Sequence, residues 1–109
     1  MTHSTERVAL TTTTTAAEAD AIADALVDRQ LAACVQIVGP ITSVYRWGGA
    51  VERSEERLLL IKTTAAAYPK VEAAIRELHS YDCPEIVALP IDAGSADYLA
   101  WLREQVRGA

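Results

Sequence analysis

The spacing of hydrophobic positions predicts a strand followed by a helix at the start of the chain. A short apolar run at 7–12 is typical of a strand. Thr15 then fits a helix cap, and Glu18 stands three residues later, where a capping box requires an acid. The helix should end near Arg29, with Glu18 on its solvated side. Its buried stripe, at the i, i+3, i+4, i+7 spacing, comprises Ala19, Ile22, Ala23, Leu26 and Val27.

Residues 33–63 are predicted to form one long β-hairpin that turns at Trp47-Gly48-Gly49-Ala50. A strand of about fifteen residues extends roughly 50 Å at about 3.3 Å per residue. A compact chain of 109 residues is only about 34 Å across. The hairpin must therefore bend, at Gly39-Pro40, and overhang the domain. Overhanging strands leave unpaired edges, so we expect a closed homo-oligomer.

The remaining patterns complete an α+β fold. The continuous apolar run at 58–61 predicts a central strand covered on both faces. The spacing of apolar residues over 66–79 predicts a helix. A strand at 85–91 carries Pro90, which favours a sheet edge. Ser95 caps a last helix, whose shared face is expected to comprise Tyr98, Trp101, Leu102 and Val106. This order predicts a ferredoxin-like split β-α-β sandwich with an extra C-terminal helix, as one domain over 1–109.

Charge and composition exclude several classes of protein. The net charge is −5 and the ten basic residues are scattered, which argues against a nucleic-acid partner. No apolar run approaches the ~20 residues needed to cross a bilayer, and the start lacks the layout of a secretory signal. We therefore expect a soluble, cytoplasmic protein without a membrane partner. Two cysteines far apart in the sequence indicate reduced thiols.

The segment from His79 to Glu85 is the densest polar cluster. Its imidazole, thiol, phenol and carboxylates have the chemistry to hold a metal or a polar ligand. A structural role is the stronger interpretation of the segment alone. In that interpretation His79 answers the negative end of a helix dipole, Tyr81 anchors the loop and Pro84 sets the entry of the strand.

Other candidate residues have competing interpretations. Cys34 should lie inside the sheet, where core packing is favoured over metal or redox work. Lys62 either reaches water or meets an anionic ligand, and solvation is slightly favoured. Tyr98 and Trp101 are expected in the core or an interface. Phosphate-loop, nucleophile-elbow and metalloprotease motifs do not occur, so the chain is not expected to be an enzyme.

Tyr45, Arg46 and Trp47 stand at the tip of the first hairpin strand. Alternation places the two aromatic rings on one face and the guanidinium on the other. Because aromatic residues and arginine are enriched in interfaces, this triplet is interpreted as a contact between subunits in preference to a stacking surface for a small molecule.

Several short motifs together resemble the CutA family of divalent-cation tolerance proteins. These motifs are L-A-A-C-V from Leu31, I-T-S-V-Y-R-W from Ile41, K-T at Lys62, H-x-Y-x-x-P-E-I from His79 and Y-L-x-W-L from Tyr98. The resemblance runs in order from the first strand to the last helix. It implies a ferredoxin-like homotrimer, with an architecture similar to PII signal proteins, whose long hairpins pair between subunits.

The resemblance also implies function. Members are linked to tolerance of copper and other divalent metals and bind such ions, with no established catalysis. A copper site proposed in some members uses a first-strand cysteine and two histidines ending the second helix. Here those positions hold Thr11, Leu78 and His79, so one ligand of that set is kept.

The resulting expectation is a non-enzymatic homotrimer that binds divalent metal, copper first and zinc second, without an organic cofactor. His79 is the leading metal ligand, and the further candidates are Cys34, Cys83, Asp82 and Glu85. The alternative is a PII-like regulator that binds a small anionic metabolite in clefts between subunits. The cleft residues of that alternative are Lys62, Tyr81, Glu85 and Trp101.

Overall fold

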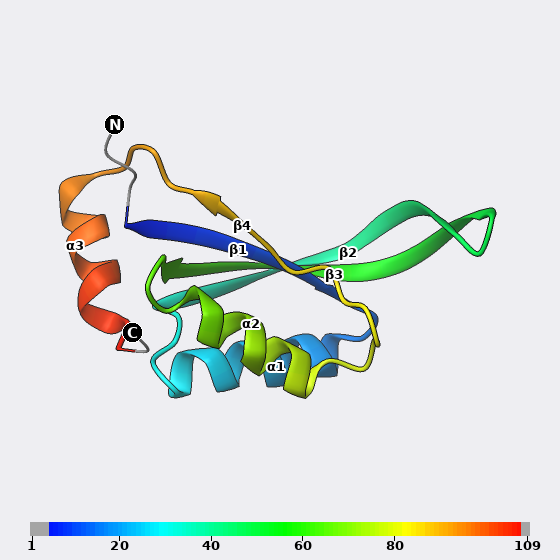
Figure 1. Ribbon diagram of the computed structural model, residues 1–109, viewed down its shortest axis with the longest axis horizontal. Helices are drawn as coiled ribbons and strands as arrows, with labels where there is room; N and C mark the ends of the chain where they lie inside the picture. Colours follow the sequence, from blue (N-terminus) through cyan, green and yellow to red (C-terminus); the bar gives the residue numbers. More distant parts are fainter. Residues whose placement is uncertain (1–4, 108–109) are drawn as a thin grey trace.

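A single antiparallel sheet with two helices on one of its faces organises the protein (Figure 1). The computed structural model describes residues 5–107. The elements in chain order are β1 Glu6–Thr13, α1 Ala16–Asp28, β2 Cys34–Trp47, β3 Ala50–Thr64, α2 Tyr68–Leu78, β4 Val87–Pro90 and α3 Ala96–Gln105. The predicted ferredoxin-like order with an added C-terminal helix is confirmed.

The strands lie in the order β2-β3-β1-β4. The central position of β3 is therefore as predicted, and β4 forms an edge, as Pro90 indicated. β4 is shorter than the predicted 85–91 and pairs with β1 only through four residues, from Arg7↔Pro90 to Leu10↔Val87. Among residues 5–107, no helix is long and apolar enough to cross a membrane.

The β2-β3 hairpin is a long ribbon that extends past the helices (Figure 1). Gly48 and Gly49 have φ values of 59° and 82°, which suits a two-residue turn of the primed type. The register shifts between Val38 and Ile41, at the bend predicted for Gly39-Pro40. A Cβ at Gly39 would lie 2.8 Å from Cγ of Arg57, so this bulge favours glycine. The longest dimension of the protein reaches 43 Å.

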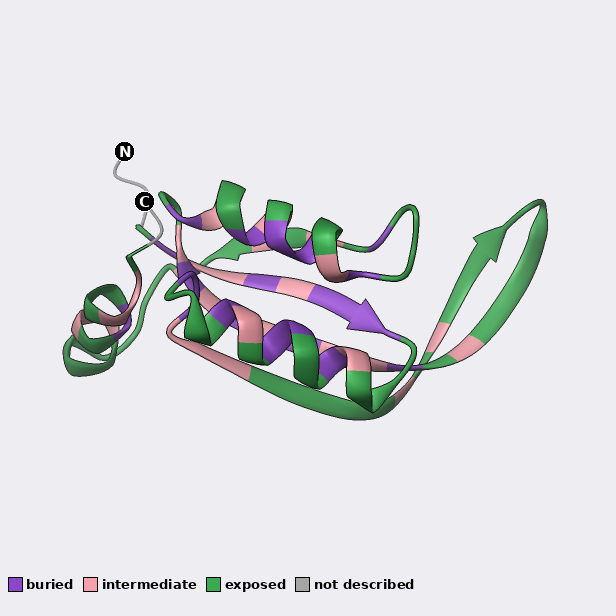
Figure 2. Ribbon diagram, turned by 90° about the horizontal axis from the view of Figure 1, so that it is seen from below, coloured by how far each residue is buried: buried purple, intermediate pink, exposed green. Residues whose placement is uncertain are grey.

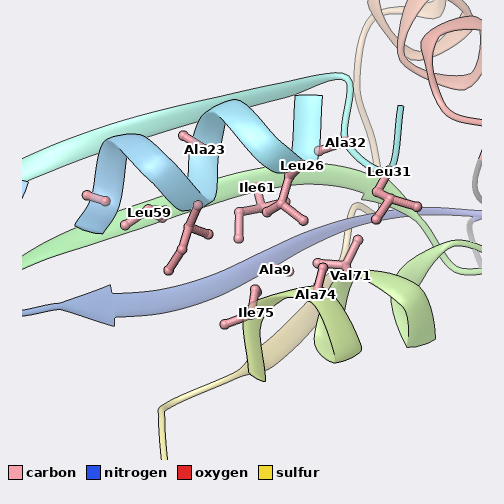
Figure 3. Close-up of a cluster of buried hydrophobic side chains, with 12 residues drawn as sticks. Ala9, Ala23, Leu26, Leu31, Ala32, Leu59, Ile61, Val71, Ala74 and Ile75 are labelled. Atoms are coloured by element: carbon pink, nitrogen blue, oxygen red, sulfur yellow. The ribbon is translucent and has the colours of Figure 1, made fainter. Parts of the chain in front are cut away.

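The hydrophobic core lies between the helices and one face of the sheet (Figure 3). Ala9 of β1 and Ile61 of β3 are opposite each other in the register and are fully buried. Ile22 and Leu26 of α1 and Ile75 of α2 cover them. Leu59, Val71 and five more aliphatic residues complete this cluster. The helical spacing therefore identified the residues that α1 contributes to the core.

Two expectations for α1 were wrong. Val27 is 44% exposed, because it lies beside the buried stripe and no other element covers it. Thr15 caps the helix through the Glu18 N–H, as predicted. However, the Glu18 carboxylate does not return to the cap. It is mostly buried against the segment that follows α2.

Helices α1 and α2 lie side by side over one face of the sheet (Figure 2). The opposite face, called the helix-free face below, meets a helix only at its end, where α3 contacts Glu6 and Lys62. Its side chains alternate with those of the core, and the register places Leu10 opposite both Leu60 and Val87. The hydrophobic residues of this helix-free face are Val8, Leu10, Val38, Leu58, Leu60, Val87 and Leu89. They are half-buried or exposed. Within a single chain, the strand segment 58–61 is therefore fully covered on one face only, and the prediction that both faces are covered was wrong.

The last helix, α3, lies at the end of the sheet opposite the ribbon (Figure 1). Arg103 bonds the buried Glu6 carboxylate at 2.6 Å, and Leu102 is fully buried. Tyr98 and Trp101 pack on each other with ring centroids 5.7 Å apart, yet both remain exposed. They are not core residues, and their interface role stays a prediction.

Candidate functional site

The polar segment between α2 and β4 is fixed by the buried ring of His79. Nε2 of His79 lies 2.6 Å from the carbonyl oxygen of Thr12, which can only accept, so Nε2 carries a proton. Nδ1 accepts the N–H of Tyr81 at 3.1 Å. The side chain is fully buried. Both nitrogens of the predicted leading metal ligand are thus engaged within the fold.

Glu18 holds the same segment from the side of α1. Its carboxylate accepts the backbone N–H of Ser80 at 3.0 Å and the Ser80 hydroxyl at 2.9 Å. Oε1 of Glu18 also lies 3.2 Å from Nδ1 of His79. The acid that the sequence assigned to a helix cap therefore connects α1 to the end of α2.

Tyr81 anchors the segment to the ribbon. Its hydroxyl lies 3.0 Å from Oε2 of Glu56 and 2.6 Å from Oγ1 of Thr14. Burial raises the pKa of Tyr81 above 10.0, so the phenol keeps its proton at neutral pH. Since a carboxylate accepts, the phenol donates to Glu56 and the Thr14 hydroxyl donates to the phenol. The predicted anchoring role of Tyr81 is confirmed.

A cavity of ≈ 630 Å³ lies between this segment and the ribbon. Glu56 and Tyr81 contribute to its lining at the base of the ribbon, and Tyr45 and Trp47 along it. Asp82, Cys83 and Glu85 belong to the same lining and are exposed. The lining contains three carboxylates and no lysine or arginine. Its electrostatics favour cations and oppose anions.

The triplet at the ribbon tip divides as predicted. Tyr45 and Trp47 share one face and line the cavity. Arg46 does not line the cavity, and its Nη1 donates to the carbonyl of Gly49 at 3.4 Å. The hydroxyl groups of Tyr45 and Ser54 lie 2.6 Å apart across the ribbon. The expected contact between subunits stays a prediction.

The residues predicted to form an anion cleft do not meet within one chain. Lys62 donates to the Gln36 amide at 3.0 Å and lies 5.9 Å from the ring centroid of Tyr98, at the α3 end of the sheet. Tyr81 and Glu85 belong to the cavity near Glu56. Lys62 lies six positions after Glu56 along β3, or roughly 20 Å away.

The predicted metal ligands are also divided. Cys34 is opposite Lys62 in the register and is half-buried on the helix-free face, not in the core. Asp82, Cys83 and Glu85 line the cavity instead. Within residues 5–107, no three His, Cys, Asp or Glu side chains lie close enough to hold a metal ion.

The residues at the family's copper positions do not fit such a site. Thr11 is fully buried, and its hydroxyl has no hydrogen-bond partner within the described chain. A threonine hydroxyl and the alkyl side chain of Leu78 are poor copper ligands. His79 is engaged as described above.

Comparisons with known proteins agree with the fold and the motifs. The family model for "CutA1 divalent ion tolerance protein" matches residues 7–105. A divalent-cation tolerance protein CutA from Thermus thermophilus is 52% identical over 99 residues, covering 91% of this chain and 96% of the relative. The human Protein CutA is 41% identical over 83 residues, which is 76% of this chain and 46% of the human protein.

Solved structures show the same architecture. The T. thermophilus structure superposes with a TM-score of 0.92 at 51% identity, covering 94% of this chain and 99% of the other. CutA1 from Oryza sativa gives a TM-score of 0.94 at 36% identity, with 100% of both chains covered. A structure from Archaeoglobus fulgidus, described as a periplasmic CutA, gives 0.90 at 34% identity, covering 94% of this chain and 99% of that one. The chain therefore belongs to the CutA1 divalent ion tolerance family.

Proposed function

We propose that this divalent-cation tolerance protein acts by reversible binding of metal ions in a homotrimer, without catalytic turnover. The observation that carries the proposal is the lining of the cavity, where a thiol and three carboxylates occur without a basic side chain. Thiolate selects copper and zinc among the divalent and soft metals. We therefore infer copper as the first metal and zinc as the second.

The metal ligands proposed are the exposed side chains Asp82, Cys83 and Glu85. His79 is a weaker candidate than the sequence suggested, because coordination would break its bond to Thr12 or to Tyr81. Since no three candidate ligands within residues 5–107 converge, the coordination shell needs a residue from a second copy or a rearrangement of the 79–85 segment.

A homotrimer is proposed because the ribbon and the helix-free face offer surfaces that one chain leaves uncovered. The anionic-metabolite alternative finds no support. The acidic lining opposes an anion, and the relatives named above are CutA proteins. Cytoplasmic location stays a prediction.

The test compares Cys83→Ser, in the segment between α2 and β4, with the identical change Cys34→Ser at the start of β2. Zinc binding is measured by calorimetry, and copper(I) binding by competition with a chromophoric chelator, which avoids thiol oxidation by copper(II). We expect at least a tenfold loss of affinity for Cys83→Ser and no change for Cys34→Ser. Equal metal affinity in the two variants would reject Cys83 as a ligand. If the native protein binds neither metal, the proposed metal-binding function is wrong.

His79→Gln provides a second discrimination. If the exposed residues hold the metal, this variant keeps its metal affinity and stoichiometry. Loss of metal binding in a folded His79→Gln protein would instead return the site to the position suggested by the family resemblance.

A further inference from the structure

The carboxylate of Glu18 is withdrawn from water and directed at the segment that follows α2. Glu18 lies in the first turn of α1, where an acidic side chain is stabilised by the helix N-terminus without leaving solvent. Here its side chain is only 16% exposed. Among residues 5–107, no lysine or arginine forms an ion pair with it. The desolvation of this carboxylate costs free energy, and its hydrogen bonds to Ser80 offset part of that cost.

Three different elements hold the first three residues of the segment. Nε2 of His79 donates to the carbonyl oxygen of Thr12 in β1 at 2.6 Å. Glu18 of α1 accepts the N–H of Ser80 at 3.0 Å and its hydroxyl at 2.9 Å. The Tyr81 hydroxyl donates at 3.0 Å to a carboxylate of β3. Residues 79–81 are therefore anchored to three separate parts of the fold.

The proposed metal ligands follow directly after these anchors. Asp82, Cys83 and Glu85 are exposed, whereas Pro84 between them is buried. Neither a helix nor a strand includes residues 79–86, because α2 ends at 78 and β4 begins at 87. No backbone ladder therefore holds the ligands in place. Their arrangement depends on the anchored residues before them and on the buried proline.

We propose that Glu18 is a positioning residue of the metal site, which fixes the segment so that Asp82, Cys83 and Glu85 are preorganised for coordination. This inference rests on the proposed metal function. Glu18 does not contact the ion and acts through Ser80. Groups that orient metal ligands from outside the coordination shell typically change metal affinity by roughly 10–100-fold, because a ligand that is already in place loses less conformational freedom on binding.

Glu18 is also the anchor that can be removed with least damage to the fold. His79 is fully buried, and the Tyr81 hydroxyl contacts two other side chains. Replacement of Glu18 by alanine places the best helix former in α1. It frees Ser80 and leaves the bond between His79 and the Thr12 carbonyl in place.

The test measures zinc affinity by calorimetry in the full-length native protein, Glu18→Ala and Asp20→Ala. Asp20 is an exposed acid two positions along the same helix, so its variant removes the same charge without removing an anchor. We expect Glu18→Ala to bind zinc about tenfold more weakly than the native protein. Asp20→Ala should stay within about twofold of the native affinity. Equal affinities in the two variants would overturn the inference.

Glu18→Gln separates positioning from simple attraction of the ion. Glutamine keeps an oxygen that accepts the Ser80 N–H but carries no charge. If Glu18 acts through the anchor, this variant should bind zinc within about threefold of the native protein. A glutamine variant as weak as Glu18→Ala would show that the charge is what matters, and would reject the positioning role.

Ser80→Ala keeps the proposal testable if Glu18→Ala does not fold. Ser80 is exposed, and its variant loses the hydroxyl bond to Glu18 but retains the N–H bond. We expect a loss of about threefold in zinc affinity. An affinity equal to that of the native protein would contradict an action through Ser80.

Hydrogen exchange of the Ser80 N–H provides a measurement that requires no metal. This N–H is bonded to Glu18, so in metal-free Glu18→Ala it should exchange about tenfold faster or more, while the amide of the core residue Ile61 keeps its native rate. An unchanged rate at Ser80 would contradict the anchor.

Failure of the metal function gives a different result from failure of the positioning role. If the native protein binds no zinc, or Cys83→Ser binds it normally, the metal site and the role of Glu18 are both rejected. If zinc binding is present and is lost in Cys83→Ser but not weakened in Glu18→Ala, the metal site stands and only the positioning role is rejected.

Discussion

The substitution Val87→Asp tests whether further copies of the chain cover the helix-free face. Val87 lies on that face, opposite Leu10, and is 46% exposed. Val27→Asp is the matched control, because Val27 has nearly the same exposure but lies on α1, on the helical side of the protein. The two variants introduce the same charge at positions of nearly equal exposure on different faces of the protein.

The expected effect follows from burial. Full burial of a valine or leucine contributes roughly 1.5–3 kcal/mol, so a half-exposed side chain has about 1 kcal/mol still to gain on assembly. An aspartate loses this gain and adds a desolvation cost of several kcal/mol, which its short side chain cannot avoid. Three copies together weaken a trimer by on the order of 10 kcal/mol, about seven powers of ten in the association constant.

Size-exclusion chromatography with light scattering measures the outcome at micromolar concentration, and circular dichroism checks folding. We expect a trimer for the native protein and for Val27→Asp, because this change affects each subunit and not the proposed contact between subunits. A carboxylate near the C-terminus of α1 costs the subunit about 0.3–1 kcal/mol. Val87→Asp should be a folded monomer. A native protein that is already monomeric, or a Val87→Asp trimer, would refute the reasoning.

Three further predictions concern the fold. His79→Ala should lower the free energy of unfolding by about 3 kcal/mol, since it leaves a cavity and an unpaired carbonyl at Thr12; a loss below about 1 kcal/mol in urea denaturation would contradict this. Hydrogen bonds from Thr5 and Arg103 hold the pKa of Glu6 below 4.5 despite its burial. The stabilisation is present above about pH 4.5 and lost as pH falls through the folded-state pKa, so Arg103→Met should flatten the acid side of a stability-versus-pH curve. Thr11→Val removes an unpaired buried hydroxyl and should raise the unfolding free energy by about 1 kcal/mol, measured in the same denaturation assay.

The parts of the fold that could be predicted depend on local signals. Gly48 and Gly49 fix the hairpin turn, Gly39-Pro40 marks the bulge, and Thr15 starts α1, each through the conformation of a few neighbouring residues. The spacing of apolar residues identified the core stripe of α1 except for Val27. Val27 was wrongly predicted to be buried. Helical spacing shows which apolar residues share a face of the helix, but not how far the rest of the protein extends over that face.

The candidate site was only partly predictable, because its contacts join residues far apart in the sequence. His79 and Tyr81 were recognisable as parts of a dense polar segment. Their partners Glu18 and Glu56 were not, since they lie 62 residues before Ser80 and 25 before Tyr81. The register of β3, after a bulge in β2, decides which face Glu56 occupies. A shift of one residue would expose it to the opposite side.

The two faces of the sheet separate the two possible locations for cation binding. Thr11 and His79 are buried on the helical side, where the Thr11 hydroxyl has no partner among residues 5–107 and His79 contacts Thr12, Tyr81 and Glu18. Glu56 and Asp82 line a cavity by the ribbon on the side that the helices leave free. Any cation bound there lies close to the surface proposed for trimer contacts, so binding and assembly should be thermodynamically linked. Monomeric Val87→Asp distinguishes the two arrangements. Retained zinc affinity would show a complete site in one chain, whereas loss of zinc affinity would show that a second copy supplies a metal ligand.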